Sequence, residues 1–443
     1  MIFFFWMPLA ATWFMMSVEG PFLAAIIARL PDPKYNLAAY GVSFSIAIFV
    51  EAPVIMLMSA STALVKDRDS FIKLRNFTYA LNAVVTLIMV LFVIPPVFDY
   101  VAQEMLNLPE PVARLAHKAC IIFIPWAGAI GYRRFYQGIL IRSNLTRRVA
   151  YGTIIRLTAM ASTGLFCCLF TKTQGAVVGA VALSSAVCVE AVASKFMVRA
   201  SVGHLLSEER QHSEAESLTY GMTARFYLPL ALTSILGLGV SPLVTFSMGH
   251  SRMAIESLAV LPVINALVFL FRSLGFSFQE VGIALFGERD QGYRPLRHFA
   301  ILLGLAVSLG LSLVAFTPLS SVWFQGVSGL SAALAAFALW PTRIVAVMPG
   351  LEVLLSFQRA LLVNHRKTGP ITLAACIEVA GIGIFLFLSI RVFGMVGAIA
   401  AALSITLGRV LANVYMTFPY LKTLPKTPTN GSLEPWPPGS SVP

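Results

Sequence analysis

Long apolar stretches alternate with short polar or turn-rich breaks along almost the whole chain. Twelve such stretches lie near residues 3–29, 37–65, 77–103, 116–141, 149–171, 175–203, 222–249, 255–286, 298–323, 331–362, 370–390 and 395–420. A helix needs about 20 residues to cross the roughly 30 Å hydrocarbon core of a bilayer. The pattern therefore predicts an all-α polytopic membrane protein with about twelve transmembrane helices.

The composition favours the same environment. Of the 443 residues, 58% are hydrophobic and only 12% are charged, whereas a soluble domain carries about 25% charged residues. Because so few charges cannot cover a water-facing surface of this size, an ordinary soluble protein is excluded. The first stretch runs past Leu30 without a small-residue cleavage site, so we expect a spanning helix there and not a signal peptide.

The distribution of Lys and Arg predicts the orientation. The loops after even-numbered segments and the C-terminal end carry most of these residues. The loops after odd-numbered segments carry few, namely Arg29, Lys34, Arg114, Lys118, Lys172, Arg252 and Arg391. By the positive-inside rule both termini should be cytoplasmic, and the compact loops suit a bacterial inner membrane. This bias accounts for most of the +12 net charge, so no nucleic-acid partner is implied. We expect a monomer in the lipid bilayer.

Two polar stretches divide the chain. We expect an N-terminal six-helix lobe over 1–203, a cytoplasmic linker over 204–221, a C-terminal six-helix lobe over 222–423, and a disordered cytoplasmic tail over 424–443. The tail is rich in Pro, Gly and Ser. Neither polar stretch can hold a soluble catalytic domain, which favours a transporter over an enzyme.

The two halves resemble each other at an offset of 221 positions. Pro8–Ala10 match Pro229–Ala231, Pro21 matches Pro242, Arg68 and Asp69 match Arg289 and Asp290, and Gln137 matches Gln358. With six helices each, both halves have the same orientation, so a pseudo-two-fold axis along the membrane normal should relate the lobes. Rocking of such lobes exposes a central cavity to each side in turn, which is alternating access.

Charged residues at membrane depth are costly and are usually paired or functional. The acids predicted there are Glu19, Glu51, Glu190, Glu280, Glu352 and Glu378, and the bases are Arg133, Arg134, Arg156, Arg272, Arg343 and Arg409. Equal numbers of the two signs indicate pairing as well as substrate binding.

Segment 331–362 holds our first choice for an anion ligand. Pro341 and Pro349 interrupt the helix, and Arg343 and Glu352 flank the second interruption. Arginine presents a rigid fork of donors that suits carboxylate or phosphate, so Arg343 is the preferred substrate-binding residue. The alternative is an arginine that snorkels or caps a helix near the outer end.

Segments two and eight hold a second candidate pair. Glu51 and Arg272 are 221 positions apart and therefore occupy equivalent places. A bridge between them would link the two lobes and gate one conformation, while Arg272 could also bind substrate. The alternative is that each pairs or snorkels within its own lobe. For Arg156 and Glu378, which are nearly equivalent, a static structural pair is expected.

Further polar residues share these helices. Gln279 and Glu280 return to the face of Arg272, seven and eight positions later, so Gln279 is a substrate-binding candidate and Glu280 a gating one. A buried hydrogen-bond network is the equal alternative. Glu19 stands beside Gly20 and Pro21 at a bend, where it could bind H⁺ or Na⁺, or be an incidental paired acid. We assign coupling or gating to Glu19, Glu51, Glu280 and Glu352.

Motifs for other chemistry are missing from the sequence. The five cysteines lie in apolar segments without metal-site spacing, and no Walker A loop, Gly-x-Ser-x-Gly elbow or His-rich cluster occurs. We therefore expect no catalytic residue, metal or cofactor, apart from a coupling ion.

Some segments resemble a known family. The relevant residues are Pro229–Leu232 and Pro242, Glu256 with Ala259–Leu261, Pro341 with Arg343, Ile344 and Pro349, Gly138–Leu140, and Ala39–Gly41. The chain resembles the superfamily of multidrug and toxic-compound extrusion (MATE) transporters and lipid-linked oligosaccharide flippases. Within it, the chain looks most like the progressive ankylosis (inorganic pyrophosphate transport regulator) family. That resemblance implies export of small polyanions such as pyrophosphate, nucleotides or citrate, with Arg343 and Glu256 as the charged residues that carry over.

These observations predict a secondary-active, alternating-access exporter of a small anionic molecule. Three alternatives stay open. They are a cation-coupled multidrug exporter, a lipid-linked precursor flippase with a lateral opening, and a non-transporting membrane scaffold with fully paired intramembrane charges.

Overall fold

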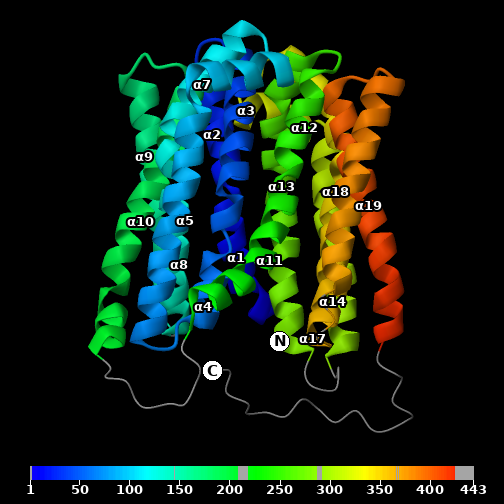
Figure 1. The fold of residues 1–443 in the computed structure, drawn as a ribbon. Coiled ribbons are helices and arrows are strands. Elements are labelled where there is room, and N and C mark those ends of the chain that lie inside the picture. Colours follow the sequence, from blue (N-terminus) through cyan, green and yellow to red (C-terminus); the bar gives the residue numbers. More distant parts are fainter. Residues whose placement is uncertain are drawn as a thin grey trace.

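The structure is a computed structural model that describes residues 2–143, 145–207, 218–286, 292–365, 367 and 369–424. These residues are almost entirely helical (Figure 1). Twelve helical segments are long and apolar enough to cross a membrane: Ile2–Ala28, Pro33–Leu64, Arg68–Phe92, Glu110–Arg142, Arg147–Phe170, Gly175–Ser207, Tyr220–Gly249, Ala254–Ile283, Tyr293–Phe316, Ala332–Asn364, Gly369–Val392 and Gly397–Thr423. The predicted fold class is confirmed.

The linker residues 208–217, the tail 425–443 and the repeat positions Arg289 and Asp290 lie outside the described residues. We call 2–207 the N-terminal half and 218–424 the C-terminal half. The chain enters α1 and leaves α19 at one end of the molecule, here called the terminal end; the opposite end is the distal end (Figure 1).

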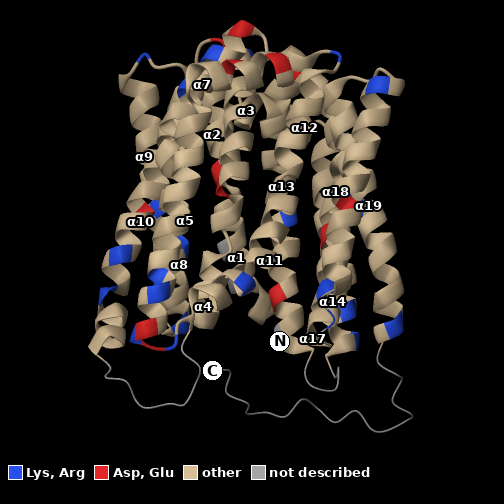
Figure 2. Ribbon diagram, viewed as in Figure 1, with Lys and Arg blue, Asp and Glu red and all other residues tan. Residues whose placement is uncertain are grey.

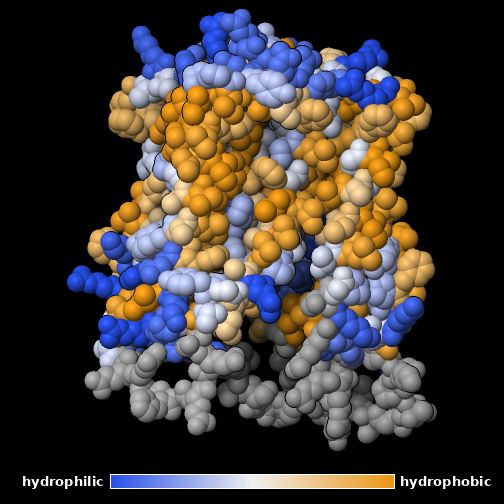
Figure 3. All heavy atoms as spheres, in the orientation of Figure 1, coloured by the Kyte–Doolittle hydropathy of each residue, from blue (hydrophilic) through white to orange (hydrophobic). Residues whose placement is uncertain are grey.

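The outer surface fits a bilayer. Charged residues gather toward the two ends of the molecule, with few in the middle of the helices (Figure 2). A hydrophobic band separates the hydrophilic ends on the face seen in Figure 3. Leu169, Phe170 and Phe393 are all more than 70% exposed, which is stable only where the solvent is apolar.

Helix breaks repeat between the halves. The first span is α1 (Ile2–Ser17) and α2 (Glu19–Ala28), and the seventh is α11 (Tyr220–Leu238) and α12 (Val240–Gly249). Their breaks, Val18 and Gly239, are 221 positions apart. The fourth span, α7 (Glu110–Ile122) and α8 (Ile124–Arg142), and the tenth, α16 (Ala332–Ile344) and α17 (Met348–Asn364), break at Phe123 and Val345–Val347. The repeat seen in the sequence therefore extends to backbone geometry.

Left-handed residues follow the same offset. Asp32 and Met253 have φ of 52° and 54°, and Asn107 and Gly329 have φ of 49° and 73°. Three of these four are not glycine, and such residues rarely adopt positive φ. Strained turns at matching places indicate that both halves turn in the same way at the distal end.

The second and eighth spans differ. The second consists of α3 (Pro33–Glu51), the 3₁₀ turn Ala52–Val54 and α4 (Leu57–Leu64), whereas the eighth is the continuous helix α13 (Ala254–Leu285). Pro53 interrupts the second span, because proline removes a backbone donor and clashes with the preceding turn. The break directly follows Glu51.

Two predicted boundaries were wrong. The third span is α5 (Arg68–Phe92), not 77–103, and the ninth is α14 (Tyr293–Phe316), not 298–323. Pro95 begins the separate short helix α6 (Pro95–Asp99), and Pro318 follows the end of α14. Each proline ends the span, because the residue before a proline avoids the helical region. A π-helical turn follows in both halves, at Tyr100–Met105 and Val322–Val327.

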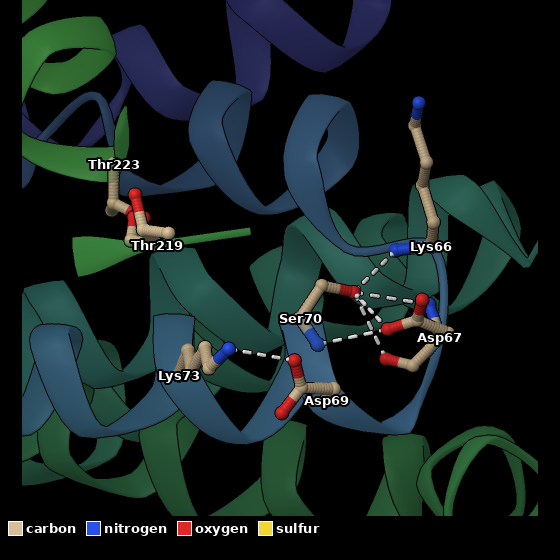
Figure 4. Close-up of polar contacts among 7 residues, drawn as sticks. All are labelled: Lys66, Asp67, Asp69, Ser70, Lys73, Thr219 and Thr223. Carbon is tan, nitrogen blue, oxygen red and sulfur yellow. Dashed lines mark hydrogen bonds and ion pairs between the residues drawn. The ribbon is translucent and has the colours of Figure 1, made fainter. Parts of the chain in front are cut away.

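The polar start of α5 is stabilised locally (Figure 4). The Asp67 side chain accepts from Ser70 N at 2.8 Å, and Ser70 Oγ accepts from Asp67 N at 3.0 Å, which forms a capping box. Lys73 Nζ lies 2.7 Å from Asp69 Oδ2. These contacts explain why the helix begins before the apolar stretch does. The Thr219 side chain caps α11 in the same region of the molecule.

The remaining spans are α9 (Thr146–Phe170), α10 (Gly175–Ser207), α18 (Gly369–Phe387) and α19 (Gly397–Thr423). Most helices pack within their own half, as α10 does on α9 and α8, and α19 on α18 and α17. α3 and α13 form the main contact between the halves. Two half-helices pack on the opposite half: α1 packs on α13, and α11 packs on the Ala52–Val54 turn and on α5.

Candidate functional site

An ion-pair chain crosses the interior of the N-terminal half. Arg133 Nη1 of α8 lies 2.5 Å from Glu190 Oε2 of α10, and Gln137 Nε2 donates to Glu190 Oε1 at 3.1 Å. Arg156 of α9 lies 3.4 Å from Glu190 and 2.5 Å from Glu19 Oε1, at the start of α2. Glu190 is fully buried. The chain therefore runs through four helices of this half and ends on Glu19.

A second chain crosses the C-terminal half. Arg272 of α13 donates to Glu352 Oε2 of α17 from Nε at 3.0 Å and from Nη2 at 2.6 Å. Arg409 of α19 lies 3.1 Å from Glu352 and 2.9 Å from Glu378 of α18. Gly275 makes room for this contact, because a Cβ there would lie 3.2 Å from Glu352 Cγ.

At equivalent spans, the residues of the two ion-pair chains carry opposite charges. Spans four and ten carry Arg133 and Glu352. Spans five and eleven carry Arg156 and Glu378, and spans six and twelve carry Glu190 and Arg409. Each chain balances its own charges, which a low-dielectric interior requires. The halves share a fold but present inverted polarity.

The exposed ends of the chains also differ in sign. In the N-terminal half the most exposed member is the carboxylate of Glu19, whose side chain is 14% exposed. In the C-terminal half it is the guanidinium of Arg272, which is 21% exposed. α2 and α13 pack together between the halves, where Ala266 would contact a Cβ added at Gly20. A carboxylate and a guanidinium thus belong to two helices that meet at the interface.

The predicted bridge between Glu51 and Arg272 is not formed, since Arg272 pairs with Glu352. Arg156 and Glu378 likewise pair within their own halves. Glu51 is buried at the end of α3, and no hydrogen-bond partner for its Oε2 is found among the described residues. Periodicity placed these residues on inward faces but could not choose their partners.

Arg343 lies apart from these chains. Its Nε donates to the Ala315 carbonyl oxygen at 3.2 Å, near the end of α14. Its guanidinium stacks on Phe316 and Trp340 at 5.6 and 5.2 Å, and both rings are at least 60% exposed. These contacts resemble the capping and snorkelling alternative more than a ligand in a cavity.

Gln279 and Glu280 follow Arg272 toward the terminal end of α13. Gln279 is half-buried and Glu280 is exposed. Trp13 of α1 is within hydrogen-bonding reach of Glu280 and stacks on Phe276 at 5.4 Å. Glu280 therefore lies at the contact with α1, whereas Arg272 faces Glu352.

A cross-half ion pair escaped the sequence analysis. Lys34 Nζ lies 2.5 Å from Glu256 Oε1 at the distal end, and the two residues are 222 positions apart. Nearby, Arg29 Nη2 donates to the Gly326 carbonyl oxygen at 2.7 Å. The sequence offered a signal, because a charge of opposite sign stands one position after Ile255, the repeat equivalent of Lys34. Within the described residues no group of three His, Cys, Asp or Glu side chains could hold a metal ion.

No protein-family model matches the chain, and a search of curated proteins finds no match. Solved structures do match. A multidrug resistance MATE family transporter of the MOP superfamily, in an inward-facing conformation, has a TM-score of 0.71 at 13% identity, over 93% of this chain and 94% of that one. The lipid II flippase MurJ, in an inward closed conformation, has a TM-score of 0.68 at 12% identity, over 94% and 90%.

A third match is a MOP superfamily transporter from Pyrococcus furiosus that is described by the reverse polarity of its binding pocket. Its TM-score is 0.65 at 13% identity, over 94% of each chain. At these identities the likeness shows the fold, and the progressive ankylosis family gains no support from it. The chain is an integral membrane protein with the twelve-helix fold of MATE-type transporters.

Proposed function

We propose that this protein is a secondary-active transporter that works by alternating access and exports a small organic or phosphate anion of the pyrophosphate, nucleotide or citrate type. The observation that carries the proposal is the guanidinium of Arg272, which is the exposed end of a buried ion-pair chain on a helix at the interface. An anion reaching this interface would meet a rigid set of donors already oriented by Glu352.

The charge around Arg272 supports an anion. Arg359 interacts electrostatically with Glu352, Glu378, Arg409 and Arg272, so this cluster has three guanidinium groups against two carboxylates. The surplus positive charge is half-buried, where charge interactions are stronger than in water. An anion at Arg272 would neutralise it. The resemblance to the progressive ankylosis family suggests which anions to try first.

The N-terminal half supplies acids for a coupling ion. Glu19 ends its chain as a partly exposed carboxylate, and Glu51 is buried without an ion pair among the described residues. Either could take up H⁺ or Na⁺ when the anion leaves Arg272. The opposite charges of the two halves would thus separate two binding functions. The coupling cation would bind in the N-terminal half and the anionic substrate in the C-terminal half.

The closed distal end supports alternating access. Lys34–Glu256 and Arg29–Gly326 join the halves there, and the MATE match is an inward-facing conformation, which agrees with access from the other side. We retain the expectation that the terminal end is cytoplasmic, the membrane a plasma membrane and the protein a monomer.

The test is efflux of labelled pyrophosphate, ATP and citrate from proteoliposomes that contain the purified protein. Arg272→Gln should slow anion efflux about tenfold or more, because a charged hydrogen bond is worth about 1.5–3 kcal/mol. Arg391→Gln, at an exposed arginine outside the ion-pair chains, is the matched control. If Arg343→Gln abolishes efflux and Arg272→Gln does not, the ligand is Arg343 and our assignment is wrong.

A multidrug exporter is the second candidate, favoured by the carboxylate of Glu19 at the interface. It predicts efflux of organic cations that Glu19→Gln abolishes and Arg272→Gln spares. The flippase alternative predicts movement of a lipid-linked substrate in the same vesicles. The scaffold alternative requires every intramembrane charge to be paired, and it predicts no efflux of any tested substrate.

A further inference from the structure

We infer that Glu51 is the proton-binding site of this transporter, and that it exchanges its proton for an ion pair with Arg134 as the halves move. The inference rests on the proposed transport function and adds to it the coupling ion and the residue that carries it. Four observations support it: the burial of Glu51, the lack of a counter-ion within 4.0 Å among the described residues, the position of Arg134, and a hydrogen bond from α11.

Glu51 is buried without a counter-ion. Its residue is 5% exposed, and within the described chain no Lys, Arg or His nitrogen lies within 4.0 Å of its carboxylate. Its Oε2 makes no hydrogen bond of good geometry there, although the buried Nε1 of Trp126 is within hydrogen-bonding reach of the carboxyl group. Because an ionised, unpaired carboxylate is very costly in such surroundings, the group is held in its neutral, protonated form in this conformation.

The charges that act on Glu51 come mainly from α8. Arg134 interacts with it most strongly, ahead of Arg133 and Arg156. Arg133 and Arg156 are already bonded to Glu190 and Glu19. Within the part of the chain that the structure describes, the Arg134 guanidinium forms one hydrogen bond, from Nη1 to Met58 Sδ at 3.9 Å, and its Nε has no partner. Arg134 is therefore available as the counter-ion once Glu51 loses its proton.

The other elements packed on α3 offer no competing partner. The titratable and charged groups on these elements include Glu19 of α2, Arg75 and Tyr79 of α5, His117 of α7, Glu190 of α10, Tyr227 of α11, His250 of α12 and Arg272 of α13. Arg75 Nη2 donates to Asn76 Oδ1, and His250 Nδ1 contacts the Phe246 carbonyl oxygen. Glu19, Glu190 and Arg272 hold their own ion pairs. His117 contacts the Val93 carbonyl oxygen, and the Tyr79 hydroxyl lies 2.9 Å from that of Tyr136.

A hydrogen bond connects this region to the other half. The helix break after Glu51 frees backbone carbonyls, and the Tyr227 hydroxyl donates to the Pro53 carbonyl oxygen. Tyr227 also packs on Phe77 at 5.4 Å. Since α11 belongs to the C-terminal half, any shift of the Ala52–Val54 turn is transmitted across the interface.

The exchange follows from these contacts. With the proton bound, Glu51 is neutral and the turn holds Tyr227. When the halves open the site to water on the distal side, the carboxyl oxygen gives its proton to water and the carboxylate forms an ion pair with Arg134. Forming that pair draws the end of α3 toward α8 and weakens the Tyr227 contact. Rebinding of a proton restores the present arrangement.

The first experiment measures protonation directly. Infrared difference spectra of the full-length protein in liposomes, recorded between neutral and alkaline pH, should contain the band of a protonated carboxyl group that disappears in Glu51→Gln. Glu104→Gln, at an exposed acid outside the spanning segments, should keep it. A band that survives in Glu51→Gln, or is lost instead in Glu19→Gln, overturns the assignment.

The second experiment measures coupling. A pH gradient should accelerate pyrophosphate efflux by wild type and Glu104→Gln, while Glu51→Gln should no longer respond to it. Tyr227→Phe keeps the ring and removes only the hydroxyl, so it should weaken the response even if Glu51→Gln folds poorly. A response retained by both Glu51→Gln and Tyr227→Phe contradicts the inference.

The two experiments separate failure of this inference from failure of the proposed function. A carboxyl band assigned to Glu51 without transport of any tested anion would keep the proton site and reject the substrate. Anion efflux that depends on Arg272 but ignores the pH gradient would keep the function and reject the proton site.

Discussion

Lys34 and Glu256 are 222 residues apart, one position beyond the repeat offset of 221, and their side chains meet with Nζ 2.5 Å from Oε1. Because the pseudo-two-fold axis exchanges equivalent residues, a contact between nearly equivalent ones lies close to that axis. Two residues of like charge would repel each other there, and two uncharged residues would form no ion pair. Opposite charges instead hold the distal ends of α3 and α13 together.

Reversing one of these charges should open the distal end. In a background without the five native cysteines, Ala38→Cys, which is fully buried one turn from Lys34, should react faster with a membrane-impermeant maleimide when Lys34→Glu is added. We expect an increase of about two- to fivefold, because a partly exposed ion pair contributes about 0.2–1 kcal/mol. Lys34→Glu combined with Glu256→Lys should restore slow labelling. Equal labelling in the single and double variants would exclude this role.

Removing the buried acid of the N-terminal chain should destabilise the protein strongly. Glu190→Gln leaves Arg133 without its carboxylate and deprives Arg156 of one of two, and breaking a buried ion pair costs about 3–5 kcal/mol. Thermal unfolding in detergent should show a clear drop in Tm. Adding Arg133→Gln should recover part of it, since the orphaned charge is removed. A further loss in the double variant would contradict the pairing.

Arg272→Lys should separate charge from geometry. Arg272 uses Nε and Nη2 together on Glu352, and a lysine ammonium cannot reproduce this fork. We expect anion efflux between that of wild type and Arg272→Gln, with a weaker apparent affinity for substrate. Efflux identical to wild type would mean that only the charge matters at this position.

Gly138→Ala should be poorly tolerated. A Cβ on Gly138 would lie 1.8 Å from Ser61 Oγ and 2.4 Å from the Met58 carbonyl oxygen, so α8 would have to move away from α4. Overpacking of this kind costs about 1–3 kcal/mol, which a lowered Tm would report. Gly203→Ala, which meets nothing within 4 Å, is the control and should leave Tm unchanged.

The sequence predicted the number of membrane spans better than the positions where they begin and end. Twelve apolar stretches are sufficient to identify twelve helices, because length and hydropathy decide insertion. The start of α5 was placed too late, since Arg68–Arg75 contains charges that the capping box and Lys73–Asp69 stabilise at a helix end. The prolines after the third and ninth spans marked the ends that hydropathy alone overran.

The candidate site was predicted only as a set of charges. Helical periodicity placed Glu51, Arg272 and Glu352 at membrane depth, but tertiary packing paired Arg272 with Glu352 and left Glu51 alone. The repeat gave equivalent positions and suggested contact between them. Nearly equivalent residues do meet near the axis, as Lys34 and Glu256 do, but Arg156 and Glu378, in the interiors of separate lobes, do not.

The packing of α1 on the opposite half has a consequence for biosynthesis. Trp6 Nε1 donates to the Leu274 carbonyl oxygen at 3.3 Å and its ring packs on Phe299 at 5.7 Å, so the first helix finds its surface on residues synthesised 268 or more positions later. During translation α1 stays in lipid, or beside the insertion machinery, without these partners until α13 and α14 have been inserted. Neither half expressed alone would possess its complete set of neighbours, and co-expressed halves should stabilise each other in the membrane.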